Sequence, residues 1–191
     1  MKFRIVTVLL FCTQFTFGQN AVDQKIHWMS WDEAIALQKA DREKFSMDQK
    51  SNPSPKKIFL DIYTGWCGWC KKMDATTFTH PVIVKYMQEN FYAVKLNAEQ
   101  KEAIHFNGHT FTNPDPDPAK RTVNELASSL LDNKMGYPST VYLDEKFQRL
   151  HVQAGYLTPQ FLEILLHFFG ENKYQSVPWE TYQQTFQGEI K

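Results

Sequence analysis

The sequence predicts an α/β fold in which a central mixed sheet is flanked by helices. Two short apolar runs, residues 58–63 and 91–96, have the length and composition of buried strands, and each follows a segment with helical signals. Further along, a pair of antiparallel strands precedes another helix, and this combination is typical of layered α/β folds. The chain has 191 residues, which suits one domain with a sizeable core.

The first 18 residues are predicted to be a signal peptide and not part of the fold. Lys2 and Arg4 form a short basic start, residues 5–17 are largely apolar, and residues 16–18 offer a cleavage site. The apolar run is shorter than the roughly 20 residues that cross a bilayer, so we expect no stable membrane anchor. The protein is therefore expected to be exported, either periplasmic or secreted.

Residues 19–55 are predicted to form an N-terminal helical extension and a linker. Ser30 and Glu33 have the spacing of a capping box, which indicates a helix from this point to about residue 45. Residues 48–57 contain two prolines and other helix-breaking residues, and they are typical of a linker.

The main domain is expected over residues 56–170. After its first strand, a helix begins near Cys67 and runs to about Thr77. A second helix has Pro81 in its first turn and reaches Glu89 before the second strand begins.

Residues 98–134 are predicted to be an elaborated insert in this domain. Residues 105–112 are expected to contribute a hairpin strand, and the proline-rich residues 113–118 a loop. Thr122 together with Glu125 indicates the start of a short helix. The insert is a candidate lid or partner surface.

The last part of the domain is expected to be a hairpin and a helix. Residues 139–143 and 149–153 have the pattern of an antiparallel pair joined by a short turn. Thr158 and the proline after it open a helix that ends near Phe169. Residues 171–191 are expected to be a C-terminal tail with a short helix.

The number of cysteines indicates a reactive pair. The chain has three cysteines, and removal of the signal peptide would take Cys12 with it. A bridge between Cys67 and Cys70 closes almost no loop, so it stabilises the fold little. A scaffold stapled by disulfides would carry several pairs that close longer loops. Cys12 leaves a lipid-anchored form open, although Phe11 stands where such sites carry a small residue.

Cys67 and Cys70 stand where a strand turns into a helix. Residues three apart in a first helical turn lie on one face, so their sulfurs can form a disulfide. The first cysteine lies at the positive end of the helix dipole, which favours its thiolate. We expect Cys67 to attack a substrate disulfide and Cys70 to resolve the mixed disulfide. The neighbouring Trp66, Gly68 and Trp69 are candidate substrate-binding residues.

Over roughly residues 56–170 the sequence resembles the thioredoxin family. Family members carry a buried aspartate six residues before the first cysteine, where Asp61 stands, and a lysine in a Lys-Leu-Asn context, where Lys95 stands. They carry a cis-proline facing the cysteines, which Pro138 matches, and a glycine closing the next hairpin, which Gly155 matches. The Cys-Gly-Trp-Cys segment is similar to that of exported thioredoxin-like proteins with an N-terminal helical extension. The resemblance implies a thioredoxin-like fold, with Asp61 and Lys95 in the catalytic machinery.

Two positions depart from the family pattern, and both border the expected substrate groove. The second residue between the cysteines is usually proline, whereas this chain has Trp69. The residue before the cis-proline is usually small or branched, whereas this chain has Tyr137. Tyr137 and Pro138 are therefore candidate substrate-binding residues whose specificity cannot be transferred from other family members.

The resemblance implies a thiol–disulfide oxidoreductase that acts on protein disulfides outside the cytoplasm and needs no cofactor beyond its cysteines. Gly68 and Trp69 place no charged side chain between the cysteines, and strong oxidants need a very stable reduced thiolate. We therefore expect a reductase or an isomerase. Such a reductase needs electrons from across the membrane, so a membrane-bound thiol donor is the implied partner.

The sequence leaves two other functions open and gives no support to a third. The 21 basic and 21 acidic residues give no reason to expect nucleic acid as a partner. A non-catalytic thioredoxin-fold module could grip peptides in the proline groove. A copper- or zinc-delivery protein could use the two cysteines and a histidine, such as His105 or His109. Their distance along the chain from Cys70 exceeds the spacing of about 12–15 residues typical of zinc fingers, and no metal site is assigned.

Overall fold

A computed structural model describes residues 25–51 and 54–191, so the signal-peptide prediction lies outside the described residues. In chain order the elements are β1 (Trp28–Met29), α1 (Trp31–Met47), β2 (Lys57–Tyr63), α2 (Gly68–Thr76), α3 (Pro81–Asn90), β3 (Phe91–Asn97), β4 (Ile104–Phe106), β5 (His109–Phe111), α4 (Glu125–Leu130), β6 (Ser139–Leu143), β7 (Arg149–Ala154), α5 (Pro159–Gly170), a 3-10 turn (Lys173–Gln175) and α6 (Trp179–Thr185).

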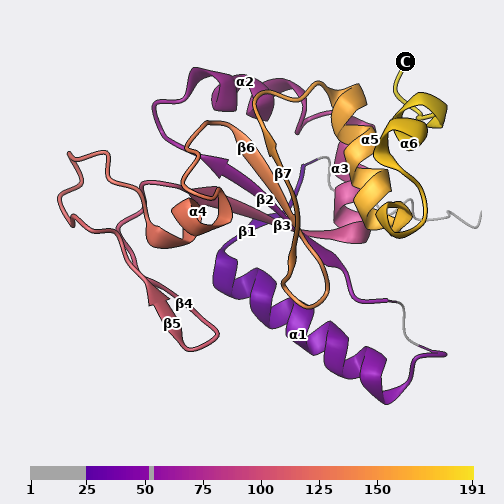
Figure 1. Ribbon diagram of the computed structural model, residues 1–191, viewed down its shortest axis with the longest axis horizontal. Coiled ribbons are helices and arrows are strands. Elements are labelled where there is room, and N and C mark those ends of the chain that lie inside the picture. Colours follow the sequence, from indigo (N-terminus) through magenta and orange to yellow (C-terminus); the bar gives the residue numbers. More distant parts are fainter. Residues whose placement is uncertain (1–24, 52–53) are drawn as a thin grey trace, which may run out of the picture.

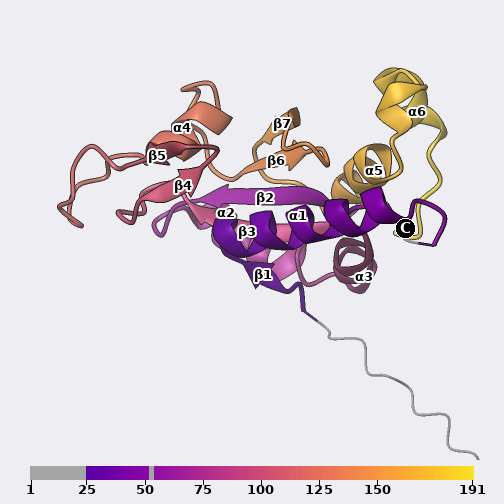
Figure 2. The ribbon, with the colours of Figure 1, turned by 90° about the horizontal axis from the view of Figure 1, so that it is seen from below.

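The five main strands form one mixed sheet in the order β1-β3-β2-β6-β7. The pairs β1–β3 and β3–β2 are parallel, whereas β2–β6 and β6–β7 are antiparallel. Figure 2 shows the strands in this order, with α1 crossing one face of the sheet. Figure 1 shows α1 and α2 on opposite sides of it. The predicted central mixed sheet flanked by helices is confirmed.

The central strand β2 is covered on both faces because its side chains alternate between two cores. Ile58, Leu60 and Ile62 pack in one core with α1 and α4. Phe59 packs in the other core, with apolar side chains of α2, α3, α5 and α6. Since successive side chains of a strand point to opposite faces, Asp61 shares the face of Phe59, which is the face that α2 covers.

The predicted starts of several helices are confirmed. Ser30 and Glu33 form the reciprocal capping box at the start of α1, with the Glu33 carboxylate 2.8 Å from the backbone nitrogen of Ser30. Pro81 stands in the first turn of α3, and Thr158 caps α5. The predicted helix in the tail is α6.

Three details differ from the predictions. β1 was not predicted, because two residues leave no periodicity to detect. Residues 105–112 form two short strands, β4 and β5, that pair with each other and not with the main sheet. The helix predicted to start at Thr122 begins at Glu125, capped by Asn124. The Thr122 hydroxyl is engaged elsewhere, with Asn113 and Lys101, and so cannot cap the helix.

Candidate active site

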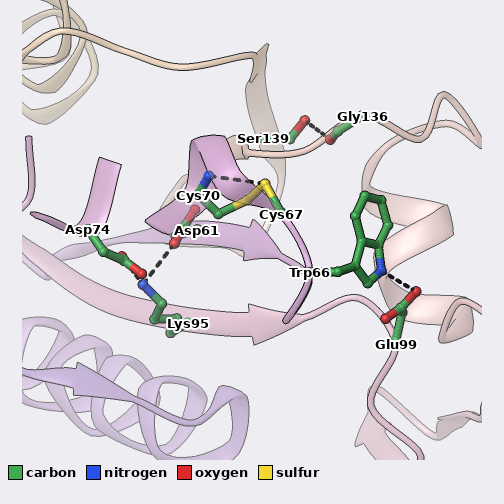
Figure 3. Close-up of a disulfide and its surroundings, with 9 residues drawn as sticks. All are labelled: Asp61, Trp66, Cys67, Cys70, Asp74, Lys95, Glu99, Gly136 and Ser139. Atoms are coloured by element: carbon green, nitrogen blue, oxygen red, sulfur yellow. Dashed lines mark hydrogen bonds and ion pairs between the residues drawn. A yellow bond between two sulfur atoms is a disulfide. The ribbon is translucent and has the colours of Figure 1, made fainter. Parts of the chain in front are cut away.

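Cys67 and Cys70 form a disulfide at the start of α2, with their Cα atoms 5.3 Å apart. Cys67 is the N-cap of this helix, and its Sγ accepts a hydrogen bond of 3.0 Å from the backbone N–H of Cys70. The side chain that caps the helix is therefore also the sulfur expected to react. Figure 3 shows this arrangement above β2.

The start of α2 favours negative charge on Cys67. The first turn of a helix presents unpaired backbone N–H groups and the positive end of the dipole. No acidic side chain lies in the first turn of α2 to offset this effect. In the reduced protein the same N–H groups stabilise a thiolate at Cys67, which is the nucleophilic form of cysteine.

Asp61 lies beneath the disulfide on the α2 side of the sheet. Its register partner on β3 is Lys95, whose ammonium is 3.2 Å from Asp61 Oδ2. The other oxygen, Oδ1, is buried without a hydrogen-bond partner among the described residues. Burial raises the pKa of Asp61 to about 6, and the positive charge of Lys95 limits the rise. Figure 3 shows Asp61 between Cys70 and Lys95.

Asp74 is a member of this cluster that the sequence analysis missed. Its carboxylate pairs with the same Lys95 ammonium that reaches Asp61. The negative charge of Asp74 also raises the pKa of Asp61. A signal was present in the sequence, because Asp74 stands four residues after Cys70 and such residues share one face of a helix.

The Lys95 ammonium is also enclosed by aromatic rings. It lies 4.9 Å from the ring centroid of Trp28, 5.2 Å from that of Tyr63 and 5.6 Å from that of Phe78. Each ring face attracts a cation. The rings therefore help to hold the Lys95 ammonium between the two carboxylates.

The peptide bond between Tyr137 and Pro138 is cis, as predicted. The Pro138 carbonyl accepts a hydrogen bond of 2.8 Å from the N–H of Gly155, which has φ +92°. A side chain is strained at this φ, which explains why glycine closes the hairpin. The predicted positions of Pro138 and Gly155 in the fold are thus correct.

The predicted groove residues Trp66 and Trp69 flank the disulfide with large exposed surfaces. Trp66 is 50% exposed, packs edge-to-face on Tyr137, and donates a 2.9 Å hydrogen bond from its indole nitrogen to Glu99. Trp69 is 57% exposed and contacts Tyr156, with 5.6 Å between ring centroids. Gly68, between the cysteines, leaves open space where a Cβ would project. Neither Glu99 nor Tyr156 was singled out from the sequence.

The histidines considered for a metal site lie on the β4–β5 hairpin, apart from α2 (Figure 1). The His105 ring is within hydrogen-bond distance of Thr110, and His109 packs on Phe111. Across residues 25–51 and 54–191, no group of three or more His, Cys, Asp or Glu side chains is placed to hold a metal ion.

A mixed sheet, a disulfide at the N-terminus of the helix after its central strand, and a cis-proline directly before β6 define a thioredoxin-fold protein with a Cys-x-x-Cys pair. The chain belongs to the Thioredox_DsbH family, described as a protein of unknown function (DUF255), whose model matches residues 10–171.

Two solved structures with a TM-score of 0.50 have the same fold. A thioredoxin-fold protein from Helicobacter pylori is 17% identical, over 68% of this chain and 83% of that one. A thioredoxin from Thermus thermophilus is 13% identical, over 75% of this chain and 85% of that one.

A curated relative from Caenorhabditis elegans is an uncharacterised protein that is 30% identical over 56 residues. These residues are 29% of this chain and 8% of that protein, so the chain matches a small part of its relative. Among the described residues, no helix combines the length and apolar character needed to cross a bilayer.

Proposed function

We propose that this protein exchanges disulfides with other proteins outside the cytoplasm, in the reducing or isomerising direction. The observation that carries the proposal is the Cys67–Cys70 disulfide at the N-terminus of α2, directly above a buried carboxylate. A short-range bridge stabilises the fold little, whereas its position activates one sulfur and supplies a neighbouring proton acceptor.

Reduction of a substrate proceeds in two exchange steps. The Cys67 thiolate attacks one sulfur of the substrate disulfide, forming a mixed disulfide and releasing the other substrate sulfur as a thiolate. The Cys70 thiolate then attacks Cys67 Sγ, which restores the Cys67–Cys70 disulfide and releases the second substrate sulfur. Two electrons pass to the substrate, and a dithiol donor must return them to the protein.

Asp61 takes the proton from Cys70 in the second step. Its pKa near 6 makes it a competent base near neutral pH, and its buried oxygen Oδ1 is free to accept a proton. Lys95 holds the carboxylate in place through Oδ2. Positioned general bases typically contribute about 10²–10⁴-fold to a rate.

The residues around Cys67 support the reducing direction. Helix N–H groups stabilise its thiolate, but Gly68 and Trp69 add no positive charge between the cysteines. Strong oxidants need greater stabilisation of the reduced form than this. In an oxidising compartment, a membrane-bound thiol protein is the donor that would keep the pair reduced.

Trapping of mixed disulfides tests the proposal. Cys70→Ser should attack substrates and remain covalently bound to them, because the resolving thiol is missing. Cys67→Ser should neither reduce disulfides nor accumulate partners. Both variants are expressed, thiol–disulfide exchange is quenched with acid, and covalent complexes are resolved on non-reducing gels. Absence of covalent partners with both variants, or better trapping by Cys67→Ser, contradicts the assigned roles.

A further inference from the structure

Two tryptophans frame the disulfide, and each carries a cation over its ring. The Arg121 guanidinium lies 5.0 Å from the Trp66 centroid. The Lys72 ammonium lies 4.7 Å from the Trp69 centroid and 5.2 Å from that of Tyr156. The surface around the reactive sulfurs is therefore both aromatic and positively charged.

A pocket of about 340 Å³ opens beside Trp66. Its walls are the apolar side chains of Trp66, Val123, Met135 and Tyr137 with Gly136, and Glu99 and Arg121 stand at it as charged residues. Tyr137, which precedes the cis-proline, packs edge-to-face on Trp66, and Trp66 is the residue directly before Cys67, so the pocket adjoins the reactive pair. Figure 3 shows Trp66 beside Cys67, with its indole directed at Glu99 and away from the sulfurs.

Most of this pocket comes from the insert and the segment that follows it. Glu99, Arg121 and Val123 belong to residues 98–134, and Met135 comes directly after. Two large apolar side chains of the pocket are exposed to solvent: Met135 is 39% exposed and Trp66 is half exposed. Exposed apolar surface of this kind beside a reactive group marks a binding site.

The cations on this surface lack carboxylate partners in the part of the chain that the structure describes. Among the described residues, neither Arg121 nor Lys72 has a carboxylate within ion-pair distance. Glu99 is the acidic residue of the pocket, and its carboxylate accepts the Trp66 indole N–H. An arginine held on an aromatic face keeps its planar donors available for a carboxylate. Lys71, exposed on the same helix turn, adds a further positive charge.

We propose that this surface binds a partner polypeptide that carries a large apolar residue next to its cysteine and acidic residues on either side. The apolar side chain enters the pocket beside Trp66, and carboxylates pair with Arg121 on one side and Lys72 on the other. This inference rests on the proposed function, since it describes the substrates of the same disulfide. Tryptophan and arginine are also the residues most enriched among those that dominate binding energy.

Reduction of designed disulfide peptides tests the inference. Three peptides share a phenylalanine next to the cysteine and differ only in flanking residues, which are glutamate, glutamine or lysine. For the wild type, kcat/KM should fall in that order, by about twofold to fivefold for each cation engaged. A fourth peptide replaces phenylalanine with serine in the glutamate series and should lose about tenfold. High salt should compress the difference between the charged peptides.

Variants assign the preference to the named residues. Arg121→Gln and Lys72→Gln should each reduce the ratio of kcat/KM between the glutamate and lysine peptides. Lys146→Gln, which removes an exposed lysine from the β6–β7 turn, should leave that ratio unchanged. Equal rates for all four peptides, or a ratio insensitive to both test variants, overturns the inference.

An uncharged small disulfide, 2-hydroxyethyl disulfide, separates this inference from the proposed function. Turnover of that compound with no preference among peptides leaves the oxidoreductase function standing and removes the specificity proposal. Absence of turnover with every disulfide contradicts the proposed function and with it this inference.

Discussion

Asp61, Lys95 and Asp74 form a charge cluster in which one ammonium serves two carboxylates. The two acids differ in environment, because Asp61 is buried whereas the Asp74 side chain is 40% exposed. Burial disfavours the charged form of a carboxylate, which explains why the pKa of Asp61 is the one raised to about 6. The negative charge of Asp74, which shares the Lys95 ammonium, adds to the rise in the pKa of Asp61.

Asp74→Asn should therefore lower the pKa of Asp61 below about 6. The substitution removes a negative charge that raises this pKa, and Asp61 becomes the one carboxylate of the cluster that pairs with the Lys95 ammonium. Carbon-13 NMR of the Asp61 carboxyl group across a pH titration of the oxidised protein measures it. Asp132→Asn, which removes an exposed carboxylate paired with Arg149, is the matched control. An unchanged or higher Asp61 pKa in the Asp74 variant would show that Asp74 has no influence on the acid.

The sequence predicted part of this cluster and missed the rest for a physical reason. Asp61 and Lys95 stand at family positions, so the resemblance implied that they lie close together, and the parallel register of β2 and β3 places them side by side. The spacing of Asp74 from Cys70 was a signal that they share a helix face, but exposed acids on helices are common and the spacing alone does not assign Asp74 to the site. The contacts of Glu99, Arg121 and Tyr156 join segments far apart in the chain, and periodicity carries no information about such contacts.

At the scale of elements, the insert shows where prediction from sequence ended. Apart from the two-residue β1, the strands of the main sheet have strong local signals and lie where predicted, as do the helices that flank them. The path of residues 98–134 depends on long-range contacts. The Asn107-Gly108 turn, with φ +50° and +77°, was a local signal for a hairpin of two short strands.

Lys101 organises the loop of this insert. Its ammonium lies within hydrogen-bond distance of four oxygens, from Asn113, Asp115, Lys120 and Thr122, at 2.9–3.4 Å. These groups bracket the proline-rich segment that leads to Arg121. The lysine thus connects the start of the insert to the part that lines the pocket.

Lys101→Met should loosen this loop without unfolding the domain. Loss of hydrogen bonds to a charged donor typically costs about 1.5–3 kcal/mol, here as local stability. Amide hydrogen exchange across residues 113–124 should accelerate by more than about tenfold, while exchange in β2 stays unchanged. Lys120→Met, which removes an exposed ion pair with Asp115, is the control and should have a smaller effect. Equal exchange in both variants would contradict the assigned role of Lys101.

At the scale of the whole molecule, Asp61 makes stability depend on pH. Its pKa in the folded protein is about 6, against an ordinary value of 3.8. The folded state therefore binds this proton more tightly than the unfolded state, so the free energy of unfolding falls as pH rises between these values. A difference of roughly two pH units corresponds to about 3 kcal/mol, lost in full above the folded pKa.

Asp61→Asn should remove this loss, because an amide of the same shape has no charge to desolvate and Lys95 keeps Asp74 as its partner. Between pH 4 and pH 8 the free energy of unfolding of the variant should rise by about 2–3 kcal/mol relative to that of the wild type. Urea denaturation of both oxidised proteins at the two pH values measures this gain. A stability difference that is the same at pH 4 and pH 8 would contradict the raised pKa.

The central claim is that Cys67 and Cys70 form a redox pair poised for reduction or isomerisation, and its reduction potential tests this most directly. The protein is equilibrated with graded glutathione and dithiothreitol buffers, acid-quenched, and the free thiols are counted by mass after alkylation. We expect reversible two-electron exchange with a potential nearer the value of about −270 mV for thioredoxin than the value of about −120 mV for a strong oxidant. A potential above about −150 mV, or a disulfide that does not exchange, would contradict it.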